Sequence, residues 1–342
     1  MKSLIWKNHS IELTDKPCPQ IMDARDAIVK VTLSSICTSD LHIIHGFVPL
    51  AKQGTTLGHE FVGEIVELGS AIKNLKIGDR VSANVETFCG ECFFCKKGFI
   101  NNCIHGGWKL GCKIDGAQAE YVRVPFADMG LNKLPENVSY KNALFVGDVL
   151  ASGYFGAELC EIKPEDTVAI IGAGPVGLCS MASARVMNAN KIIAIDIDNK
   201  RLELAKEQKL ADYTLNPIEC NIEEEIKNLT EGRGADCVIE NAGAKNTFEM
   251  SWKIARANAI IALVGMYEKA QILPLPDMYG KNLIFKTGGV DARHSEKLLK
   301  YISEGKINTD FLITQSFKLN DIEKAYKFFE EKPEFCLKIA IE

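Results

Sequence analysis

The sequence lacks any long apolar run, any excess of positive charge and any secretion signal. No stretch of about eighteen apolar residues occurs in the 342-residue chain, so we expect no membrane span. Lys and Arg number 40 against 45 Asp and Glu, and the net charge of −5 gives no electrostatic reason to bind nucleic acid. The first residues become polar too soon for a signal peptide, so we expect a cytoplasmic protein.

Internal repeats and low-complexity segments are also absent. The composition is that of a globular protein, with 46% hydrophobic and 25% charged residues. A chain of 342 residues exceeds what one hydrophobic core usually supports, so we expect two domains. Twelve cysteines without a secretion signal favour reduced thiols and metal ligation over a disulfide framework.

Four of the twelve cysteines cluster in a glycine-containing segment that we expect to be a loop. They are Cys89, Cys92, Cys95 and Cys103. Four thiolates at such short spacing can surround one tetrahedral Zn²⁺, and a site with all four positions filled by protein is structural. Unrelated cysteines or two disulfides are the alternatives, but a loop gives cysteines no packing reason to cluster. We therefore predict a structural zinc site here.

The pattern of strands and helices changes along the chain. In the first part, short alternating segments such as 29–33 predict a mostly-β region. From about Pro164, buried strands alternate with helices, as in 167–171 followed by 176–188. This alternation predicts a parallel, doubly wound sheet. The C-terminal tail predicts two helices and a strand over 335–341, and composition alone does not decide which domain the tail joins.

A glycine-rich motif joins the first buried strand of the second region to its helix. The glycines of this G-x-G-x-x-G motif are Gly172, Gly174 and Gly177, and Pro175 and Val176 lie between the last two. The glycines permit a tight turn and let the backbone approach the pyrophosphate of a dinucleotide, which would sit at the helix N-terminus. The strand before the motif and the helix after it make this a predicted dinucleotide site.

An acidic residue is expected at the end of the next strand, about 20 residues after the motif, to bind the ribose hydroxyls of the cofactor. Asp196 occupies this position, and its charge would repel a 2′-phosphate. We therefore predict NAD(H) rather than NADP(H), although the nearby Arg201 could serve a phosphate instead. Further expected cofactor contacts are Val264, Gly265 and Met266.

A second, open metal site has four candidate residues. They are Cys37, His59, Glu60 and Asp148. A lone His or Cys on a strand is more often structural than a ligand, and these residues are far apart in the sequence. Their spacing alone therefore gives weak evidence for a site.

The segment that begins at Gly58 resembles the zinc signature of the medium-chain zinc-dependent alcohol dehydrogenases, whose catalytic zinc is a familiar example of an open site. The matching residues are Gly58, His59, Glu60, Gly63 and Gly69. The four-cysteine loop and the later nucleotide motif fall in the order of that family, so the resemblance covers essentially the whole chain. It is closest to the bacterial secondary-alcohol dehydrogenases.

The resemblance implies an α/β protein with two domains. A GroES-like, mostly-β catalytic domain would comprise residues 1–150 and 291–342, and a Rossmann dinucleotide-binding domain would comprise residues 151–290. Cys37, His59 and Asp148 match the ligands of a catalytic zinc, which gives two Zn²⁺ per subunit. Aspartate replaces the cysteine that many members have as third ligand. Glu60 either joins as a fourth ligand or supports the ligands from outside.

The implied reaction is oxidation of a secondary alcohol to a ketone, and its reverse, by hydride transfer to NAD. Zinc would lower the pKa of the alcohol, and Ser39 and His42 match the relay that carries its proton to solvent. Thr38 matches a nicotinamide contact. Trp108 and Val290 match residues that face the substrate, although a partly buried core tryptophan is an equal alternative for Trp108.

Two departures from the secondary-alcohol subgroup keep other functions open. The cysteine tetrad is complete, and Asp196 replaces the small residue of an NADP enzyme. Both features favour polyol and butanediol dehydrogenases, but those relatives usually supply a glutamate ligand near Asp148. An amino-alcohol dehydrogenase of the same fold is a further alternative. A zinc- and nucleotide-binding protein without turnover is a third alternative. The partners implied are a small alcohol or ketone and further copies of the chain, with a tetramer favoured over a dimer.

Overall fold

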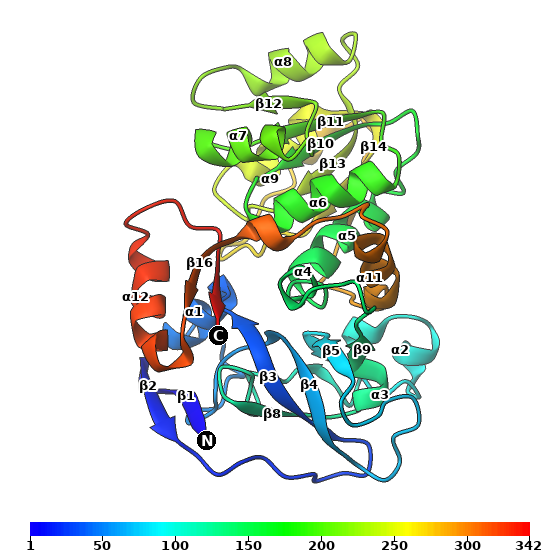
Figure 1. The fold of residues 1–342 in the computed structure, drawn as a ribbon. Helices are drawn as coiled ribbons and strands as arrows, with labels where there is room; N and C mark the ends of the chain where they lie inside the picture. Colours follow the sequence, from blue (N-terminus) through cyan, green and yellow to red (C-terminus); the bar gives the residue numbers. More distant parts are fainter. The chain divides into compact units, whose positions relative to one another are not determined.

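The computed structural model describes residues 1–342 and divides into two compact units. Unit 1 comprises Met1–Ala151 and Asp291–Glu342, and unit 2 comprises Ser152–Val290. Both chain termini belong to unit 1 (Figure 1). Every helix is too short or too polar to cross a membrane.

Unit 2 is built on a sheet of six parallel strands in the order β12-β11-β10-β13-β14-β15. The strands are β10 (Thr167–Ile171), β11 (Lys191–Ile195), β12 (Tyr213–Leu215), β13 (Ala235–Glu240), β14 (Ala255–Leu263) and β15 (Ile284–Thr287). The helices are α5 (Val149–Leu159), which starts just before the boundary, α6 (Pro175–Val186), α7 (Asn199–Glu207), α8 (Ile222–Leu229), α9 (Thr247–Ile254) and α10 (Leu275–Met278). The predicted doubly wound parallel sheet is thus confirmed (Figure 1).

The central strand of this sheet shows why the prediction was reliable. All five residues of β10 are buried, because helices cover both faces of such a sheet. A strand of this kind has a continuous apolar sequence and can be recognised without alternation. The order of the strands reverses between β10 and β13, and ligands of open α/β sheets bind at such switch points.

Unit 1 contains a seven-stranded sheet in the order β16-β17-β3-β4-β5-β9, with β8 also paired to β3. Its strands are β3 (Ala27–Ser35), β4 (Glu60–Leu68), β5 (Arg80–Ala83), β8 (Tyr121–Val124), β9 (Leu131–Lys133), β16 (Ile313–Phe317) and β17 (Lys338–Ile341). Two separate two-stranded antiparallel sheets are formed by β1 (Lys2–Lys7) with β2 (Ser10–Asp15), and by β6 (Glu86–Thr87) with β7 (Gly107–Trp108). These strands agree with the mostly-β character predicted from the sequence.

Unit 1 also contains helices, most of which are short. The helices are α1 (Thr38–Ile44), α2 (Phe93–Lys96), α3 (Ala127–Gly130), α4 (Tyr140–Ala143), α11 (Ser295–Ser303) and α12 (Ile322–Glu331), with 3₁₀ turns at Ile100–Asn102, Asp310–Leu312 and Leu319–Asp321. The segment of the four cysteines is therefore not wholly a loop, because α2 and one 3₁₀ turn lie within it. Helices α11 and α12 are the two helices predicted for the C-terminal tail, whereas the other helices of unit 1 are too short for helical periodicity to be recognised.

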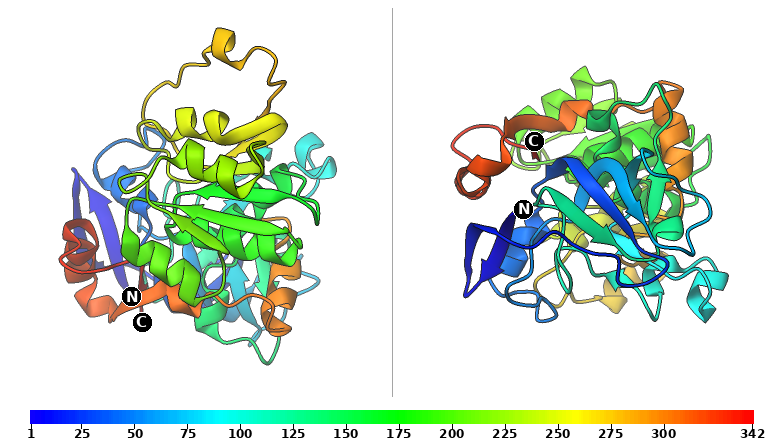
Figure 2. Two further views of the ribbon diagram at one scale, coloured as in Figure 1. Left: turned by 90° about the horizontal axis from the view of Figure 1, so that it is seen from above. Right: turned by 60° about the horizontal axis from the view of Figure 1, so that its bottom comes forward.

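The C-terminal tail completes the fold of unit 1. Strand β17 lies between β16 and β3, and it is shorter than the strand predicted over 335–341. Helix α12 lies beside β2, as the red and dark blue segments of Figure 2 show. Side chains from both ends of the chain, among them Leu4, Trp6, Tyr326 and Ile339, form one hydrophobic cluster. The tail thus belongs to the same unit as the first strands.

Candidate functional site

Four potential metal ligands from distant parts of the sequence meet in unit 1. The donor atoms of Cys37, His59, Glu60 and Asp148 all lie within 4.8 Å of one another. Cys37 follows β3, His59 and Glu60 stand at the start of β4, and Asp148 precedes α5. The antiparallel pairing of β3 with β4, which places Ser35 opposite Glu60, brings the first three together.

His59 is at the centre of this group and is only 1% exposed. Its Nε2 lies 3.3 Å from Oδ2 of Asp148 and 3.2 Å from Oγ of Ser39. Its Nδ1 lies 3.3 Å from Oδ1 of Asp40. Burial works to lower the pKa of His59, but the two carboxylates more than offset it and hold this pKa well above its ordinary value. The surroundings of the imidazole are therefore strongly negative.

This donor set fits a zinc ion. A thiol, an imidazole and carboxylates are the ligands zinc takes in proteins, and ligand sets of this kind occur in catalytic zinc sites. Burial tends to raise the pKa of Asp148, yet the neighbouring His59 keeps it below its ordinary value. Several acidic groups this close together need a cation to balance them, since their mutual repulsion is poorly screened away from water.

The carboxylate of Glu60 is paired with the ammonium group of a lysine. Nζ of Lys338, from β17, lies 2.7 Å from Oε1 and 2.6 Å from Oε2 of Glu60, and both side chains are buried. Burial raises the pKa of Glu60, and the charge of Lys338 limits that rise. Burial works to lower the pKa of Lys338, but Glu60 and other acidic neighbours hold it above its ordinary value. Lys338 thus places a positive charge beside Glu60, and a zinc ion balanced by Cys37 and Asp148 needs no charge from Glu60.

Asp40 is a site residue that the sequence analysis missed. Its fully buried carboxylate accepts hydrogen bonds from N–H of Cys37 at 2.9 Å and from Nε2 of Gln118 at 3.3 Å. Tyr326 in turn donates to Oε1 of Gln118 at 2.6 Å, and burial keeps the pKa of this phenol well above its ordinary value. A carboxylate on the far nitrogen of a ligating histidine fixes the ring orientation. Asp40 occupies the N3 position of α1, and an acidic residue at N3 is a helix-capping pattern that can be recognised in the sequence.

The predicted relay residues lie on helix α1. Ser39 and His42 are three residues apart and therefore share one face of the helix, and both are half-buried. The hydroxyl of Ser39 is beside His59, as described above, whereas the ring of His42 contacts Phe47 edge-on at 6.1 Å between centroids. Thr38, the first residue of the helix, is exposed.

The two residues expected to face the substrate lie in different units. The ring of Trp108 meets the ring of His59 edge-on, with 5.4 Å between centroids. Trp108 is half-buried and its indole N–H has no hydrogen-bond partner. Val290 is the last residue of unit 2 and is partly buried.

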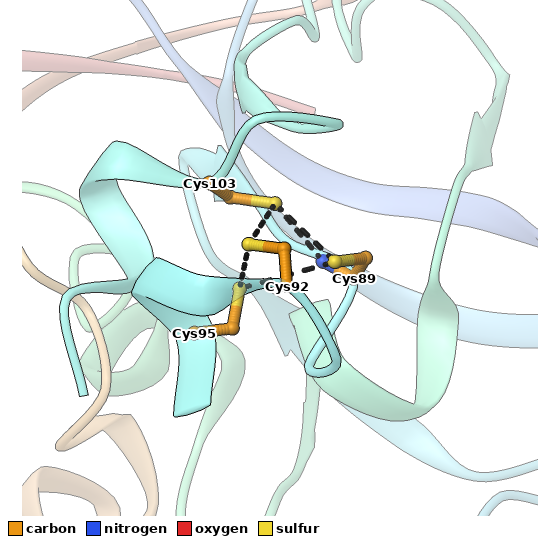
Figure 3. Close-up of side chains that lie close together, drawn as sticks. All are labelled: Cys89, Cys92, Cys95 and Cys103. Atoms are coloured by element: carbon orange, nitrogen blue, oxygen red, sulfur yellow. Dashed lines mark hydrogen bonds between the residues drawn. The ribbon is translucent and has the colours of Figure 1, made fainter. Parts of the chain in front are cut away.

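The four clustered cysteines converge on one point (Figure 3). Sγ of Cys92 lies 3.5 Å from that of Cys95 and 4.0 Å from that of Cys103, and Sγ of Cys103 lies 3.6 Å from that of Cys89. All four thiols are free. Sulfurs bound to one tetrahedral zinc at about 2.3 Å lie roughly 3.8 Å apart, so these distances fit a structural zinc and exclude the disulfide alternative.

The thiols of this cluster do not ionise independently. Hydrogen bonds from N–H groups of Cys95 and Ile104 lower the pKa of Cys92 to about 6. Burial and the neighbouring Cys92 raise the pKa of Cys95 to about 12. Four thiolates therefore require a cation among them.

We expect the variant Cys92→Ser to lose one of two zinc ions per subunit and to melt about 5–10 °C lower, the shift that a loss of roughly 2–4 kcal/mol causes. Metal analysis and a thermal melt measure both effects. The control is Cys18→Ser, since Cys18 is exposed and belongs to neither ligand cluster, and it should keep both ions. A Cys92→Ser protein with two full zinc sites would contradict the assignment.

The predicted nucleotide motif forms the turn between β10 and α6 in unit 2. Gly172 has φ +91°, a left-handed conformation that favours glycine, and Gly177 must be glycine because a Cβ there would lie 1.8 Å from the carbonyl oxygen of Gly172. Gly174 precedes the helix, and Pro175 and Val176 begin it. The turn therefore leaves helix N–H groups open toward an incoming phosphate.

Asp196 follows β11 and is tied to this turn. Its Oδ2 accepts a hydrogen bond from N–H of Ala173 at 2.6 Å, and its Oδ1 accepts one from N–H of Asp198 at 2.9 Å. Nη1 of Arg201 lies 3.7 Å from Oδ2 of Asp196. Asp196, which is expected to bind the ribose, and Arg201, which could bind a phosphate, are thus direct neighbours.

The remaining predicted cofactor residues follow β14. Backbone N–H groups of Val264 and Gly265 both donate to the carbonyl oxygen of Glu240, the last residue of β13. A Cβ at Gly265 would lie 2.4 Å from the backbone nitrogen of Gly243, so the two segments are in close contact. The side chain of Met266 is exposed.

Comparison with known proteins agrees with this architecture. The model of the alcohol dehydrogenase GroES-like domain matches residues 23–136, and that of the zinc-binding dehydrogenases matches residues 175–298. An alcohol dehydrogenase of Cupriavidus necator is 36% identical, with 97% of this chain and 95% of the relative covered. The NADP-dependent isopropanol dehydrogenase of Thermoanaerobacter brockii is 32% identical, with 96% and 94% covered.

Solved structures give the same result. The zinc-dependent alcohol dehydrogenase 2 of Streptococcus pneumonia has a TM-score of 0.93 and 37% identity, with 100% of this chain and 98% of that chain covered. The 2R,3R-butanediol dehydrogenase of Bacillus subtilis has a TM-score of 0.88 and 25% identity, with 100% and 99% covered. These relatives act on alcohols, so this chain is an oxidoreductase of CH–OH donors. It belongs to the zinc-dependent medium-chain alcohol dehydrogenase family.

Proposed function

We propose that this enzyme oxidises a secondary alcohol to a ketone, and catalyses the reverse reaction, with NAD as hydride acceptor. The observation that carries the proposal is the meeting of Cys37, His59 and Asp148 beside the hydroxyl of Ser39. These three residues would hold the catalytic zinc. When bound, zinc supplies Lewis acidity that lowers the pKa of an alcohol.

Ser39 accepts the proton of the alcohol in this proposal. Its hydroxyl is 3.2 Å from Nε2 of His59, which places it beside the ligands and within reach of an oxygen that joins them. His42, on the same face of α1, receives the proton near the outer end of the path, because an imidazole titrates close to neutral pH. Asp40 holds His59 in position but transfers no proton.

The preference for NAD rests on Asp196. A carboxylate fixed by two backbone N–H groups accepts hydrogen bonds from ribose hydroxyls and repels a 2′-phosphate. The carboxylate of Asp196 also lies beside Arg201 and offsets its positive charge, which would otherwise attract the 2′-phosphate of NADP. The Thermoanaerobacter relative is named as NADP-dependent, so in this proposal the two proteins use different cofactors.

The test is steady-state oxidation of propan-2-ol and butan-2-ol by zinc-loaded enzyme, with NAD⁺ and with NADP⁺. We expect kcat/KM to be at least about tenfold higher with NAD⁺. Asp196→Ser should shift the ratio toward NADP⁺, because it removes the charge that repels the phosphate and one of the two carboxylates beside Arg201. Lys209→Ser, a change at an exposed lysine of the same unit, is the matched control and should leave the ratio unaltered. A wild-type preference for NADP⁺ would refute the cofactor assignment. No turnover of any alcohol by protein with two zinc ions would refute the enzymatic proposal.

We also propose that the enzyme is a homo-oligomer, with a tetramer favoured. Unit 2 carries several large apolar side chains that are mostly exposed, among them Ile272, Leu275 and Tyr279. Exposed apolar side chains in one region of a chain are typical of protein–protein contacts. A monomer in light scattering at micromolar concentration would contradict this assembly.

A further inference from the structure

The short pair of strands β6 and β7 places two polar side chains next to the proposed metal site. Glu86 and Trp108 are directly opposite each other in this antiparallel pair, so their side chains project from the same face. The ring of Trp108 meets the ring of His59 at 5.4 Å. The charges of Asp148 and His59 both act on the carboxyl group of Glu86. This face of the strand pair is therefore directed at the reaction site.

Both side chains carry a buried polar atom without a partner. Oε2 of Glu86 and Nε1 of Trp108 are inaccessible to solvent, and neither makes a hydrogen bond. Buried polar groups in folded proteins are almost always paired, and an unpaired one calls for a specific reason. Two such atoms from residues opposite each other, beside a catalytic centre, indicate that a ligand group pairs with them.

We propose that Glu86 and Trp108 bind a second hydroxyl group of the alcohol, so that the preferred substrates are diols or other polyhydroxy alcohols. This inference rests on the proposed function and specifies its substrate class. The indole N–H can only donate a hydrogen bond, and a carboxylate can only accept one. A hydroxyl group does both and satisfies the two side chains together. An ammonium group would leave the indole unpaired, and a carbonyl oxygen would leave the carboxylate unpaired.

The electrostatics of Glu86 are compatible with a hydroxyl partner. Burial, with a smaller contribution from Asp148, raises the pKa of Glu86 to about 7. Near neutral pH the carboxyl group is therefore present in both protonation states. A hydroxyl group donates to the ionised form and accepts from the protonated form, whereas a carbonyl oxygen would pair with the protonated form alone and a fixed cation with the ionised form alone.

The experiment compares butane-2,3-diol with butan-2-ol, which differ by one hydroxyl group. With zinc-loaded enzyme and NAD⁺, we expect kcat/KM for the better diol stereoisomer to exceed that for butan-2-ol by about 10- to 100-fold, since a site built for a hydroxyl group rejects analogues without it. In Glu86→Ile and in Trp108→Phe this ratio should fall toward about 1, while Glu86→Gln, which still accepts a hydrogen bond, should retain most of it. Glu91→Gln, at an exposed glutamate that forms an ion pair with Arg25, is the matched control and should leave the ratio unchanged.

Binding gives a second readout that does not depend on turnover. With NADH present, the diol should raise the melting temperature of the wild type more than butan-2-ol does at equal concentration, and Glu86→Ile should abolish the difference. Zinc content and melting temperature of each variant show that it is folded. If the wild type oxidises both alcohols equally well, this inference is wrong and the proposed function stands. If it oxidises neither, both are wrong.

Discussion

Replacing Ser39 by alanine should lower kcat by about 10²- to 10⁴-fold, the usual contribution of a positioned proton acceptor. The reason is geometric: its hydroxyl is 3.2 Å from Nε2 of His59. Without this hydroxyl the alcohol must lose its proton to solvent directly. The rate of Ser39→Ala should therefore rise with pH more steeply than that of the wild type, since hydroxide can replace the missing acceptor. Stopped-flow measurement of NADH formation follows this step.

Two further variants separate proton transfer from metal binding. Ser39→Thr keeps a hydroxyl group at the same position and should restore most of the activity. Asp148→Asn should instead reduce the zinc content from two ions to one per subunit, because Asp148 is a proposed ligand. Ser39→Ala should keep both ions. An unchanged kcat in Ser39→Ala, with full zinc content, would remove Ser39 from the proton path.

Replacing Lys338 by methionine should destabilise unit 1 by about 3–5 kcal/mol, as is typical when one partner of a buried ion pair is removed. Lys338 and Glu60 are both almost fully buried and 2.6 Å apart, so Lys338→Met leaves a carboxylate without its cation. Part of this free energy can be recovered if Glu60 then takes a proton or binds the zinc. Urea denaturation of the zinc-loaded protein measures the loss.

The chain offers a control and a double variant for this measurement. Lys318 forms an ion pair with Glu342 at 2.5 Å, but the lysine is 70% exposed, so Lys318→Met should cost less than about 1 kcal/mol. The double variant Lys338→Met with Glu60→Gln removes both charges and should be more stable than Lys338→Met alone. Equal effects of Lys338→Met and Lys318→Met would show that the buried pair contributes no more than a surface pair.

Features determined by local sequence were predictable. The turn at Gly172 and Gly177 requires glycines for steric reasons, and β10 is continuously apolar because both its faces are buried. The four cysteines lie close in the sequence, so their spacing alone indicates a metal. The return of the tail to the first domain came from family resemblance, since the sequence of 335–341 is compatible with either sheet.

Three residues of the site, Asp40, Lys338 and Glu86, were not found from the sequence, because their roles depend on tertiary contacts. Asp40 acts through Nδ1 of His59, which lies on another strand. Lys338 occurs in a strand whose residues are all buried, and a buried charged residue usually needs a partner of opposite charge. Its partner Glu60 is remote in the sequence, so the pair could not be predicted. The proposed role of Glu86 could not be predicted from the sequence, because a strand of two residues has no recognisable pattern. The role is inferred from a buried carboxylate oxygen without a hydrogen-bond partner, which only the structure shows.

The position of β17 between β16 and β3 has a consequence for biosynthesis. Strand β3 leaves the ribosome early, whereas its neighbour β17 emerges only after the whole of unit 2 has been translated. The cysteine cluster depends on a short segment and can acquire its metal early during synthesis. Glu60 has no counter-charge until Lys338 has been made. The buried charge of Glu60 is therefore balanced only at the end of synthesis, when β17 has been made and inserted beside β3.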